Sequence, residues 1–444
     1  MPTIAADDGD AATGPAPAQL DPDARIRLLP LTYLTEGDEV TVGCAATNSY
    51  AVLPEDGAGL LRRLGEGGTL GEAADWYRET YGETVDLAEF LEAIVDLGFV
   101  DTAGPTAEDT AGRTAGRPPA APPPVRWARL GRIVFSPLSG LCFLALAALT
   151  AALMVRHRDL VPGNHDLFFT RYMTVMELVT FLGQFPLLLL HESFHALAGR
   201  RLGLASRLSV GRRLYYVVFL TEMDGLVTVP RRKRYLPMLA GMTADVLVIM
   251  VLTVCADATR RADGSLSLTG GILLALSYTT VLRLLWQFFF YIETDLYYVF
   301  VTVLGCVDLQ GAARAVLRNR WYRLRRTPQR MTDPAVWHPR DRSVARWYSW
   351  LLLAGWTFSF ASLGLIIIPV AVRVFSKVGG RLDDPGAQSV SGLLDSAVFL
   401  SLNLAQLCFA LWLAVRAQRS RRAARTAATA GATAGTAATA TTLS

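Results

Sequence analysis

Residues 186–200 read Pro-Leu-Leu-Leu-Leu-His-Glu-Ser-Phe-His-Ala-Leu-Ala-Gly-Arg. Within this stretch, His191, Glu192 and His195 form the pattern His-Glu-x-x-His. Residues four apart on a helix share a face, so the two imidazoles can bind one Zn²⁺ ion. The glutamate between them is placed to act as the general base toward a water molecule. Because the surrounding residues are apolar, the pattern predicts a zinc hydrolase site inside a lipid bilayer.

A simpler interpretation of the same residues is available. The pattern is short and arises by chance, and two histidines near a helix end can be interfacial side chains. However, the chain has only five histidines, and this pair lies in an apolar helix. Ionisable residues at membrane depth are costly and usually have a function, which favours the zinc site.

The composition divides the chain into two parts of opposite charge. Overall, 52% of the residues are apolar and the mean hydropathy is +0.31. Residues 1–110 contain 22 acidic residues and 5 arginines, whereas the remainder is strongly basic, and the net charge of the whole chain is +4. This split predicts an acidic soluble domain joined to a membrane domain flanked by basic residues.

The first part predicts a small α+β domain at residues 23–103, after a disordered segment at residues 1–22. Three strands are expected and then three helices, the second of which Thr69 can cap. The strands are predicted at residues 27–31, 39–45 and 50–53, and the first and third helices at residues 54–64 and 86–97. A Thr47-Asn48-Ser49 turn is expected between the second and third strands. This order is typical of a winged-helix-like fold.

The second part predicts an α-helical membrane domain with about six transmembrane helices. A proline- and alanine-rich linker precedes it at residues 104–125, and a disordered tail follows at residues 419–444. The spans are expected at residues 133–155, 172–197, 236–256, 271–303, 347–372 and 393–415. A small β insertion is predicted after the second span, at residues 214–220 and 226–229 with a break at Asp224-Gly225. An arginine-rich loop is predicted at residues 314–346.

Basic residues predict the orientation of this multi-pass protein in the cell membrane. The segments at 200–235 and 306–346 and the C-terminal tail are rich in arginine. Basic loops usually stay in the cytoplasm, so the N-terminal domain and the tail are expected there. The His-Glu-x-x-His pattern then lies toward the cytoplasmic end of the second span.

A catalytic zinc site keeps three protein ligands, so one more ligand is needed. His157 and His165 are expected in the opposite loop, and His338 lies in the hydrophilic arginine-rich segment. The carboxylates within predicted spans are few, and residues alone leave the choice among them open: Glu177, Asp245, Glu293 and Asp295.

Residues 25–103 resemble the peptide-binding domain of the pyrroloquinoline-quinone biosynthesis chaperone, a PqqD-like leader-recognition element. The resemblance rests on Asn-Ser-Tyr-Ala-Val-Leu at 48–53, Gly-Gly-Thr-Leu-Gly-Glu-Ala at 67–73 and Leu-Gly-Phe-Val at 97–100. It implies that a leader peptide pairs with the edge of the third strand and packs on the third helix. A DNA-binding winged helix is the alternative, but the acidity of this segment opposes a phosphate backbone, so no nucleic acid is expected.

Residues 126–310 resemble the site-2 protease family of intramembrane zinc metalloproteases. Thr294-Asp295-Leu296-Tyr297-Tyr298 and Gly305-Cys306-Val307-Asp308-Leu309 are similar to a subgroup found with peptide natural-product clusters. The resemblance implies Asp295 rather than Glu293 as the third zinc ligand, with Glu192 as general base. Ala240-Gly241-Met242-Thr243-Ala244-Asp245 departs from the family pattern, which has a proline and an asparagine there.

The other intramembrane carboxylates have weaker assignments. We expect Glu177 to be a packing or polar-cavity residue, Asp245 to orient a metal ligand, and Glu293 to pair with a ligand or with Arg283. The strand-like residues 215–229 are expected to pair with the substrate backbone as an added strand, or else to form a membrane-surface hairpin.

Together, the two resemblances imply an intramembrane zinc endopeptidase that removes the leader of a ribosomally made peptide natural product, of the daptide kind. The expected partners are the precursor peptide, the lipid bilayer and other biosynthetic enzymes or an exporter. One alternative is a regulatory site-2 protease that releases a membrane-bound anti-sigma factor; such enzymes usually carry a PDZ domain, and none is recognisable here. Another is a non-catalytic transporter or immunity protein, which would tolerate Glu192→Gln.

Overall fold

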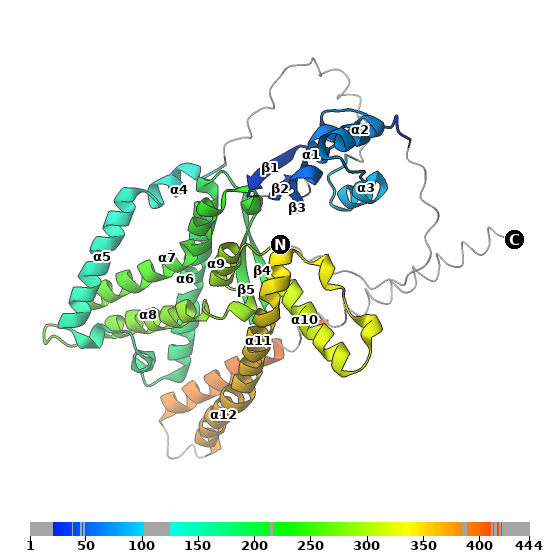
Figure 1. Cartoon of the computed structure of the whole chain (residues 1–444). Helices are drawn as coiled ribbons and strands as arrows, with labels where there is room; N and C mark the ends of the chain where they lie inside the picture. The colour runs from blue at the N-terminus through cyan, green and yellow to red at the C-terminus, as the bar shows by residue number, and fades with distance from the viewer. Residues whose placement is uncertain are drawn as a thin grey trace, which may run out of the picture.

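The computed structural model describes residues 21–101, 125–383 and 389–409, apart from 38, 45, 46, 48, 214 and 215, and four separate positions farther on (Figure 1). The predicted disordered ends and linker, residues 1–22, 104–125 and 419–444, lie almost entirely outside these described residues. The described chain is mostly helical, with one small sheet near the N-terminus and one hairpin farther along.

The N-terminal unit, residues 21–101, is a three-stranded antiparallel sheet followed by three helices. Its strands are β1 (Leu31–Glu36), β2 (Glu39–Cys44) and β3 (Ser49–Pro54), paired in the order β1-β2-β3. Its helices are α1 (Glu55–Gly65), α2 (Leu70–Tyr81) and α3 (Leu87–Asp96). One apolar core joins both layers, and its fully buried members include Val40, Val42, Leu60, Leu61 and Phe99.

Local sequence explains the helix starts in this unit. Thr69 caps α2 in a capping box with Glu72, as the sequence predicts, and the Asp86 carboxylate accepts two backbone N–H groups at the start of α3. The predicted first strand at 27–31 is wrong, because β1 begins only at Leu31 and continues to Glu36. Pairing with β2 decides this position, since residues before β1 form only isolated bridges. The predicted turn after β2 includes Asn48, which is outside the described residues.

The membrane part, residues 125–409, is built from helices and one β-hairpin. The helices before the hairpin are α4 (Ala128–Val134), α5 (Pro137–Arg156) and α6 (Met173–Arg201), and the hairpin consists of β4 (Ser206–Arg213) and β5 (Tyr216–Met223). After it come α7 (Arg231–Ala258), α8 (Leu268–Trp286), α9 (Asp295–Leu304), α10 (Leu309–Leu324), α11 (Pro339–Ser362), α12 (Ile368–Asp383) and a helix at Val390–Phe409.

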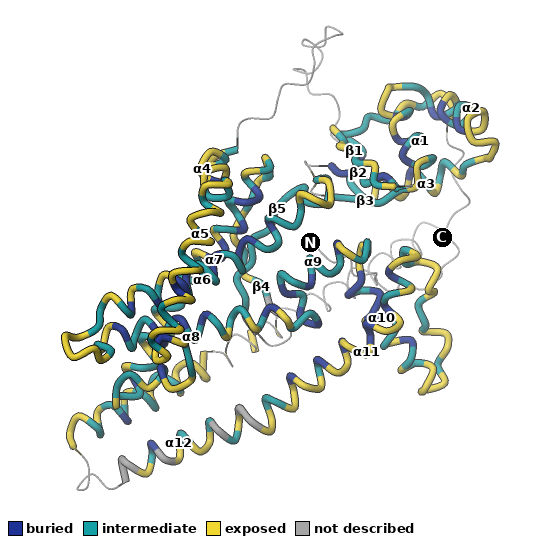
Figure 2. The backbone as a smooth tube through the Cα atoms, turned by 60° about the vertical axis from the view of Figure 1, so that its left-hand side comes forward, coloured by how far each residue is buried: buried dark blue, intermediate teal, exposed yellow. Residues whose placement is uncertain are grey.

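Several of these helices indicate a membrane-embedded protein. Within the described residues, five are long and apolar enough to cross a bilayer, namely α5, α6, α7, α8 and Val390–Phe409. A sixth crossing results if α9 and α10, which meet at 87°, form one broken span. Figure 2 shows exposed residues along much of α5, where Leu138, Leu141 and Leu144 are each more than 60% exposed. Such an apolar surface is expected to face lipid.

The structure corrects two predictions in this part of the chain. The predicted fourth span at 271–303 is not one helix, because α8 ends at Trp286 and α9 begins at Asp295. The predicted loop at 314–346 is largely helical, since α10 and the start of α11 occupy it. The predicted fifth span at 347–372 is helical throughout, across α11, a π-helical turn at Leu363–Ile367 and α12, although it is not among the five apolar helices.

The β insertion was predicted in the right region but with the wrong turn. The strands are β4 and β5, paired from Ser206↔Met223 to Arg213↔Tyr216, and residues 226–229 form a 3-10 turn, η3 (Leu226–Thr228). Asp224-Gly225 therefore ends β5 instead of separating two strands. Gly225 has φ +81°, a left-handed conformation that directs the chain from the hairpin into η3.

The N-terminal unit contacts one end of the membrane part (Figure 1). The Glu36 carboxylate accepts hydrogen bonds from the backbone and side chain of Arg231 and from the side chain of Arg234 at the start of α7. A second contact joins Glu39 of β2 to His338, just before α11. These ion pairs place the N-terminal sheet beside the start of α7, a helix that also contributes to the site described next.

Candidate metal centre

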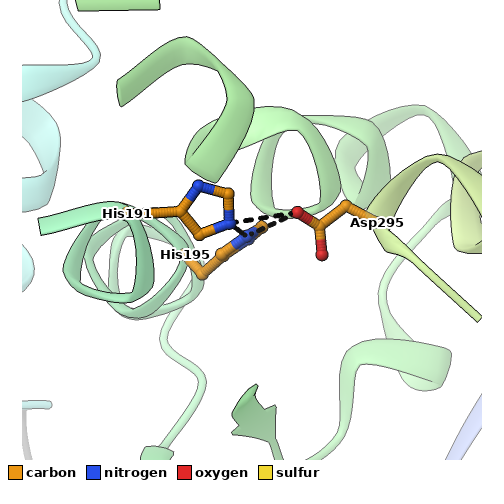
Figure 3. Close-up of side chains that lie close together, drawn as sticks. All are labelled: His191, His195 and Asp295. Carbon is orange, nitrogen blue, oxygen red and sulfur yellow. Dashed lines mark hydrogen bonds and ion pairs between the residues drawn. The ribbon is translucent and has the colours of Figure 1, made fainter. Parts of the chain in front are cut away.

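Helix α6 presents two imidazoles on the same face, one turn apart (Figure 3). His191 and His195 are 4% and 5% exposed, and Glu192 beside them is 7% exposed. Their Nε2 atoms are 3.2 Å apart. The i, i+4 spacing read from the sequence therefore produces the pair of facing nitrogens that it predicts.

Asp295, the first residue of α9, completes the group from a distant part of the chain. Its Oδ2 atom lies 3.2 Å from Nε2 of His191 and 3.2 Å from Nε2 of His195. The Asp295 backbone N–H donates to the Gln287 side chain, and the Thr294 hydroxyl donates to the Gln287 backbone carbonyl. These two hydrogen bonds join the end of α8 to the start of α9, and they fix the direction of the Asp295 carboxylate.

Side chains of α10 and α11 also stabilise the segment between α8 and α9 through hydrogen bonds to its backbone. Tyr348 donates its hydroxyl to the Phe290 carbonyl at 3.0 Å, and Gln310 donates to the Tyr291 carbonyl at 3.1 Å. Tyr348 is fully buried and Gln310 is 4% exposed. The helices that follow the site therefore support the turn that delivers Asp295.

The three side chains could hold a metal ion, since their ligand atoms all lie within 4.8 Å of one another. A tetrahedral metal with ligands near 2.0–2.1 Å requires neighbouring donor atoms about 3.3 Å apart. The three observed separations of 3.2 Å match that value. Two imidazoles and one carboxylate with a further open position are a donor set that suits Zn²⁺ and other divalent metals.

Helix α7 lies against both imidazoles. The backbone carbonyl of Pro237 is 2.7 Å from Nδ1 of His195, so that nitrogen carries the proton and Nε2 is left as the metal-facing donor. At Gly241, an added Cβ would lie 2.2 Å from Nε2 of His195 and 2.4 Å from Nε2 of His191. The absence of a side chain there lets both imidazole rings pack directly against α7.

Asp245, also on α7, contacts the outer side of His191. Its Oδ2 atom is 3.0 Å from Nδ1 of His191, off the line of an ideal hydrogen bond. Arg283 of α8 donates to the same carboxylate, with Nη2 2.6 Å from Oδ1, and to Gln184 of α6 at 2.8 Å. Asp245 is fully buried, so Arg283 supplies the charge that a buried carboxylate requires.

Glu192 points to a different neighbour, the β-hairpin. The Thr221 hydroxyl of β5 lies 2.8 Å from the Glu192 carboxylate and 3.0 Å from the Glu192 backbone carbonyl. A cavity of about 130 Å³ borders Glu192 between α6 and the hairpin. Its lining comprises Leu189, Glu192, Ser193, Ala196, Arg200, Ser206, Arg207, Leu208 and Thr221.

The remaining predicted carboxylates lie away from the three ligand atoms. Glu177 accepts hydrogen bonds from Asn403 and Gln406 of the last described helix, which agrees with its expected polar packing role. Glu293 pairs with Arg314 at 3.0 Å. The expected pairing of Glu293 with Arg283 is wrong, because Arg283 forms its ion pair with Asp245.

Sequence reasoning gave no role in this site to Gly241, Gln287 or Thr221, and it assigned Arg283 to the wrong carboxylate. One local signal was present for the first, the spacing Pro237-x-x-x-Gly241-x-x-x-Asp245, which puts all three positions on one face of a helix. Arg283 and Thr221 act through contacts with segments far away in the chain, and Gln287 acts across the break between α8 and α9, which no apolar pattern in the sequence reveals.

Comparison with known proteins adds no assignment to this geometry. No protein-family model matches the chain, and neither the curated proteins nor the solved structures contain a match to it.

Proposed function

We propose that this chain is an intramembrane zinc endopeptidase that removes the leader segment from a ribosomally made precursor peptide. The observation that carries the proposal is the convergence of His191, His195 and Asp295, with their ligand atoms 3.2 Å apart, on apolar helices. A buried group of this kind beside a buried glutamate is the arrangement that zinc peptidases require.

Each residue has a distinct part in the proposed reaction. The two histidines and Asp295 hold Zn²⁺, which when bound polarises the peptide carbonyl and makes water a better nucleophile. Glu192 takes the proton from the attacking water and transfers it to the leaving amine. Thr221 holds the Glu192 carboxylate through its hydroxyl at 2.8 Å, so the base keeps one orientation.

The β-hairpin supports an extended substrate at the same place. Peptide bonds within a helix are shielded, so a substrate segment must be extended before it is cleaved. Strands β4 and β5 pair with each other, and among the described residues neither pairs with a third strand. A substrate segment can therefore add to this hairpin by backbone hydrogen bonds, next to the cavity that borders Glu192.

The N-terminal unit supports the capture of a leader peptide. It has three strands followed by three helices, the order predicted for a winged-helix-like unit, and β3 is an edge strand of the sheet. The Glu36 ion pairs hold this unit at the start of α7, the helix that borders both imidazoles. A leader bound there raises the concentration of its attached core near the metal centre. We place this unit and the C-terminal tail in the cytoplasm, on the basis of the arginine-rich segments.

The test combines metal content with cleavage. The full chain is purified in detergent and its zinc is measured. In a second arm, the DNA on either side of its gene is searched for a short peptide gene, and the peptide found there is co-expressed with the chain to measure cleavage. We expect His195→Ala and Asp295→Ala to lose both zinc and cleavage, whereas Glu192→Gln keeps zinc and loses cleavage. Glu177→Gln is the matched control, an intramembrane carboxylate on the same helix that should change neither. Full cleavage by Glu192→Gln would refute the proposal.

A further inference from the structure

Three positions on α7, spaced four residues apart, all face the two imidazoles. They are Pro237, Gly241 and Asp245, and this i, i+4, i+8 spacing puts them on one face of the helix. All three are buried. We call this set the α7 stripe.

Each member of the α7 stripe meets the histidines in a different way. The Pro237 carbonyl accepts from Nδ1 of His195 at 2.7 Å. Gly241 lets α7 approach both Nε2 atoms closely, since an added Cβ would lie 2.2–2.4 Å from them. The Asp245 carboxylate lies 3.0 Å from Nδ1 of His191. The stripe thus contacts the outer nitrogen of each ring and packs without a side chain against the inner ones.

The groups that contact the two Nδ1 atoms differ in charge, and Arg283 neutralises the one that is negative. The Pro237 carbonyl is neutral, whereas Asp245 is a carboxylate that is fully buried. Arg283 contacts both oxygens of Asp245, at 2.6 Å to Oδ1 and 3.3 Å to Oδ2. Gln184 accepts from Arg283 at 2.8 Å and donates to Thr279 at 2.5 Å, so the arginine is itself held in place.

We propose that Asp245 and Arg283 act together as positioning residues for His191, with the α7 stripe serving as the template for both imidazoles. A carboxylate 3.0 Å from Nδ1 favours the tautomer in which Nδ1 carries the proton and Nε2 is free to bind a metal, and its contact restricts the rotation of the ring. Arg283 makes this acceptor charge-neutral overall, so a buried carboxylate can stay next to His191. The inference rests on the proposed metal site but not on peptide cleavage.

The test measures the affinity of the metal alone. The full chain in detergent is stripped of metal and titrated with Zn²⁺ against a coloured chelator, and with Co²⁺ while its visible spectrum is recorded. We expect Asp245→Asn to weaken zinc binding roughly 10- to 100-fold, the usual effect of losing an outer hydrogen-bond partner of a metal ligand. The Co²⁺ spectrum should shift as well, because the His191 ring is no longer held at one angle.

A paired variant separates positioning from simple stability. Arg283→Gln alone leaves Asp245 as an uncompensated buried charge, which can prevent folding. Asp245→Asn/Arg283→Gln removes both charges, so it should fold like the wild type and still bind zinc weakly. Glu177→Gln is the control and should bind zinc normally.

Wild-type zinc affinity and an unchanged Co²⁺ spectrum in the double variant would overturn the inference, even if the proposed function holds. If the wild-type chain itself binds no zinc, the proposed function fails together with it. Weak zinc binding in the double variant, with normal cleavage at saturating zinc, supports the positioning role.

Discussion

Gly241→Ala is the smallest change that tests the metal centre without touching any ligand. An ordinary helical glycine gains stability when replaced by alanine, by about 1 kcal/mol. At Gly241, however, the new methyl group would lie 2.2 Å from Nε2 of His195 and 2.4 Å from Nε2 of His191. These distances are far shorter than any ordinary carbon–nitrogen contact, so the methyl would push both Nε2 atoms out of the positions from which they meet Asp295.

The expected magnitude follows from that overlap. In the metal-free protein, the imidazoles can rotate away, and overpacking of this size costs about 1–3 kcal/mol, part of which the better helix propensity offsets. Metal binding has no such escape, because two of the three ligand atoms must then leave the positions in which all three lie 3.2 Å apart. We therefore expect zinc affinity to fall by more than ~100-fold, beyond the usual effect of losing an outer-shell partner, while the fold is retained.

The assay is zinc titration of the purified variant, with helix content and thermal unfolding measured in parallel. Gly140→Ala is the matched control, since it also lies in an apolar helix and an added Cβ there meets nothing within 4 Å. It should bind zinc like the wild type and be slightly more stable. Wild-type zinc affinity in Gly241→Ala would refute the reasoning, because the imidazoles would then not face α7 as described.

Three further predictions concern other parts of the molecule. Thr221→Val should keep zinc but lower kcat roughly 10- to 100-fold, because the charged Glu192 carboxylate, the proposed base, loses the hydrogen bond from the Thr221 hydroxyl. An unchanged kcat would argue against a role for that contact. Glu36→Arg should release the N-terminal unit from Arg231 and Arg234, because it replaces the carboxylate that pairs with both arginines. A spin-label distance between that unit and α7 should then broaden, and an unchanged distance would contradict the ion-pair contact. The hydrogen bond to Asp56 raises the pKa of Tyr77 to about 12. The stability that Tyr77 contributes is therefore complete below the unfolded pKa of about 10 and is lost as pH rises toward 12. Tyr77→Phe should remove this alkaline loss of stability from a plot of unfolding free energy against pH, and persistence of the loss in the variant would show that another group causes it.

The residues near one another in sequence were largely predictable. His191 and His195 share a face because the helix repeat sets their spacing, and the run of leucines before them already indicates a helix in lipid. The cap of α2 at Thr69 follows from its own side chain and Glu72. Asp295 was chosen over Glu293 by family resemblance alone, since both are carboxylates in one aromatic segment and differ only in position.

What the tertiary structure decided was which distant segments meet. The interruption at residues 287–294 is held by α10 and α11, so a continuous apolar run becomes two helices and Asp295 turns toward α6. Likewise, strand pairing set the ends of β1 and of the hairpin. Sequence periodicity determines which face of a helix is apolar, but the partner of that face depends on packing between helices. For that reason the sequence alone determined the two histidines and their glutamate, and family resemblance implied Asp295. Only the folded chain brought the Asp295 carboxylate to the histidines and supplied the close approach at Gly241 and the Asp245–Arg283 pair.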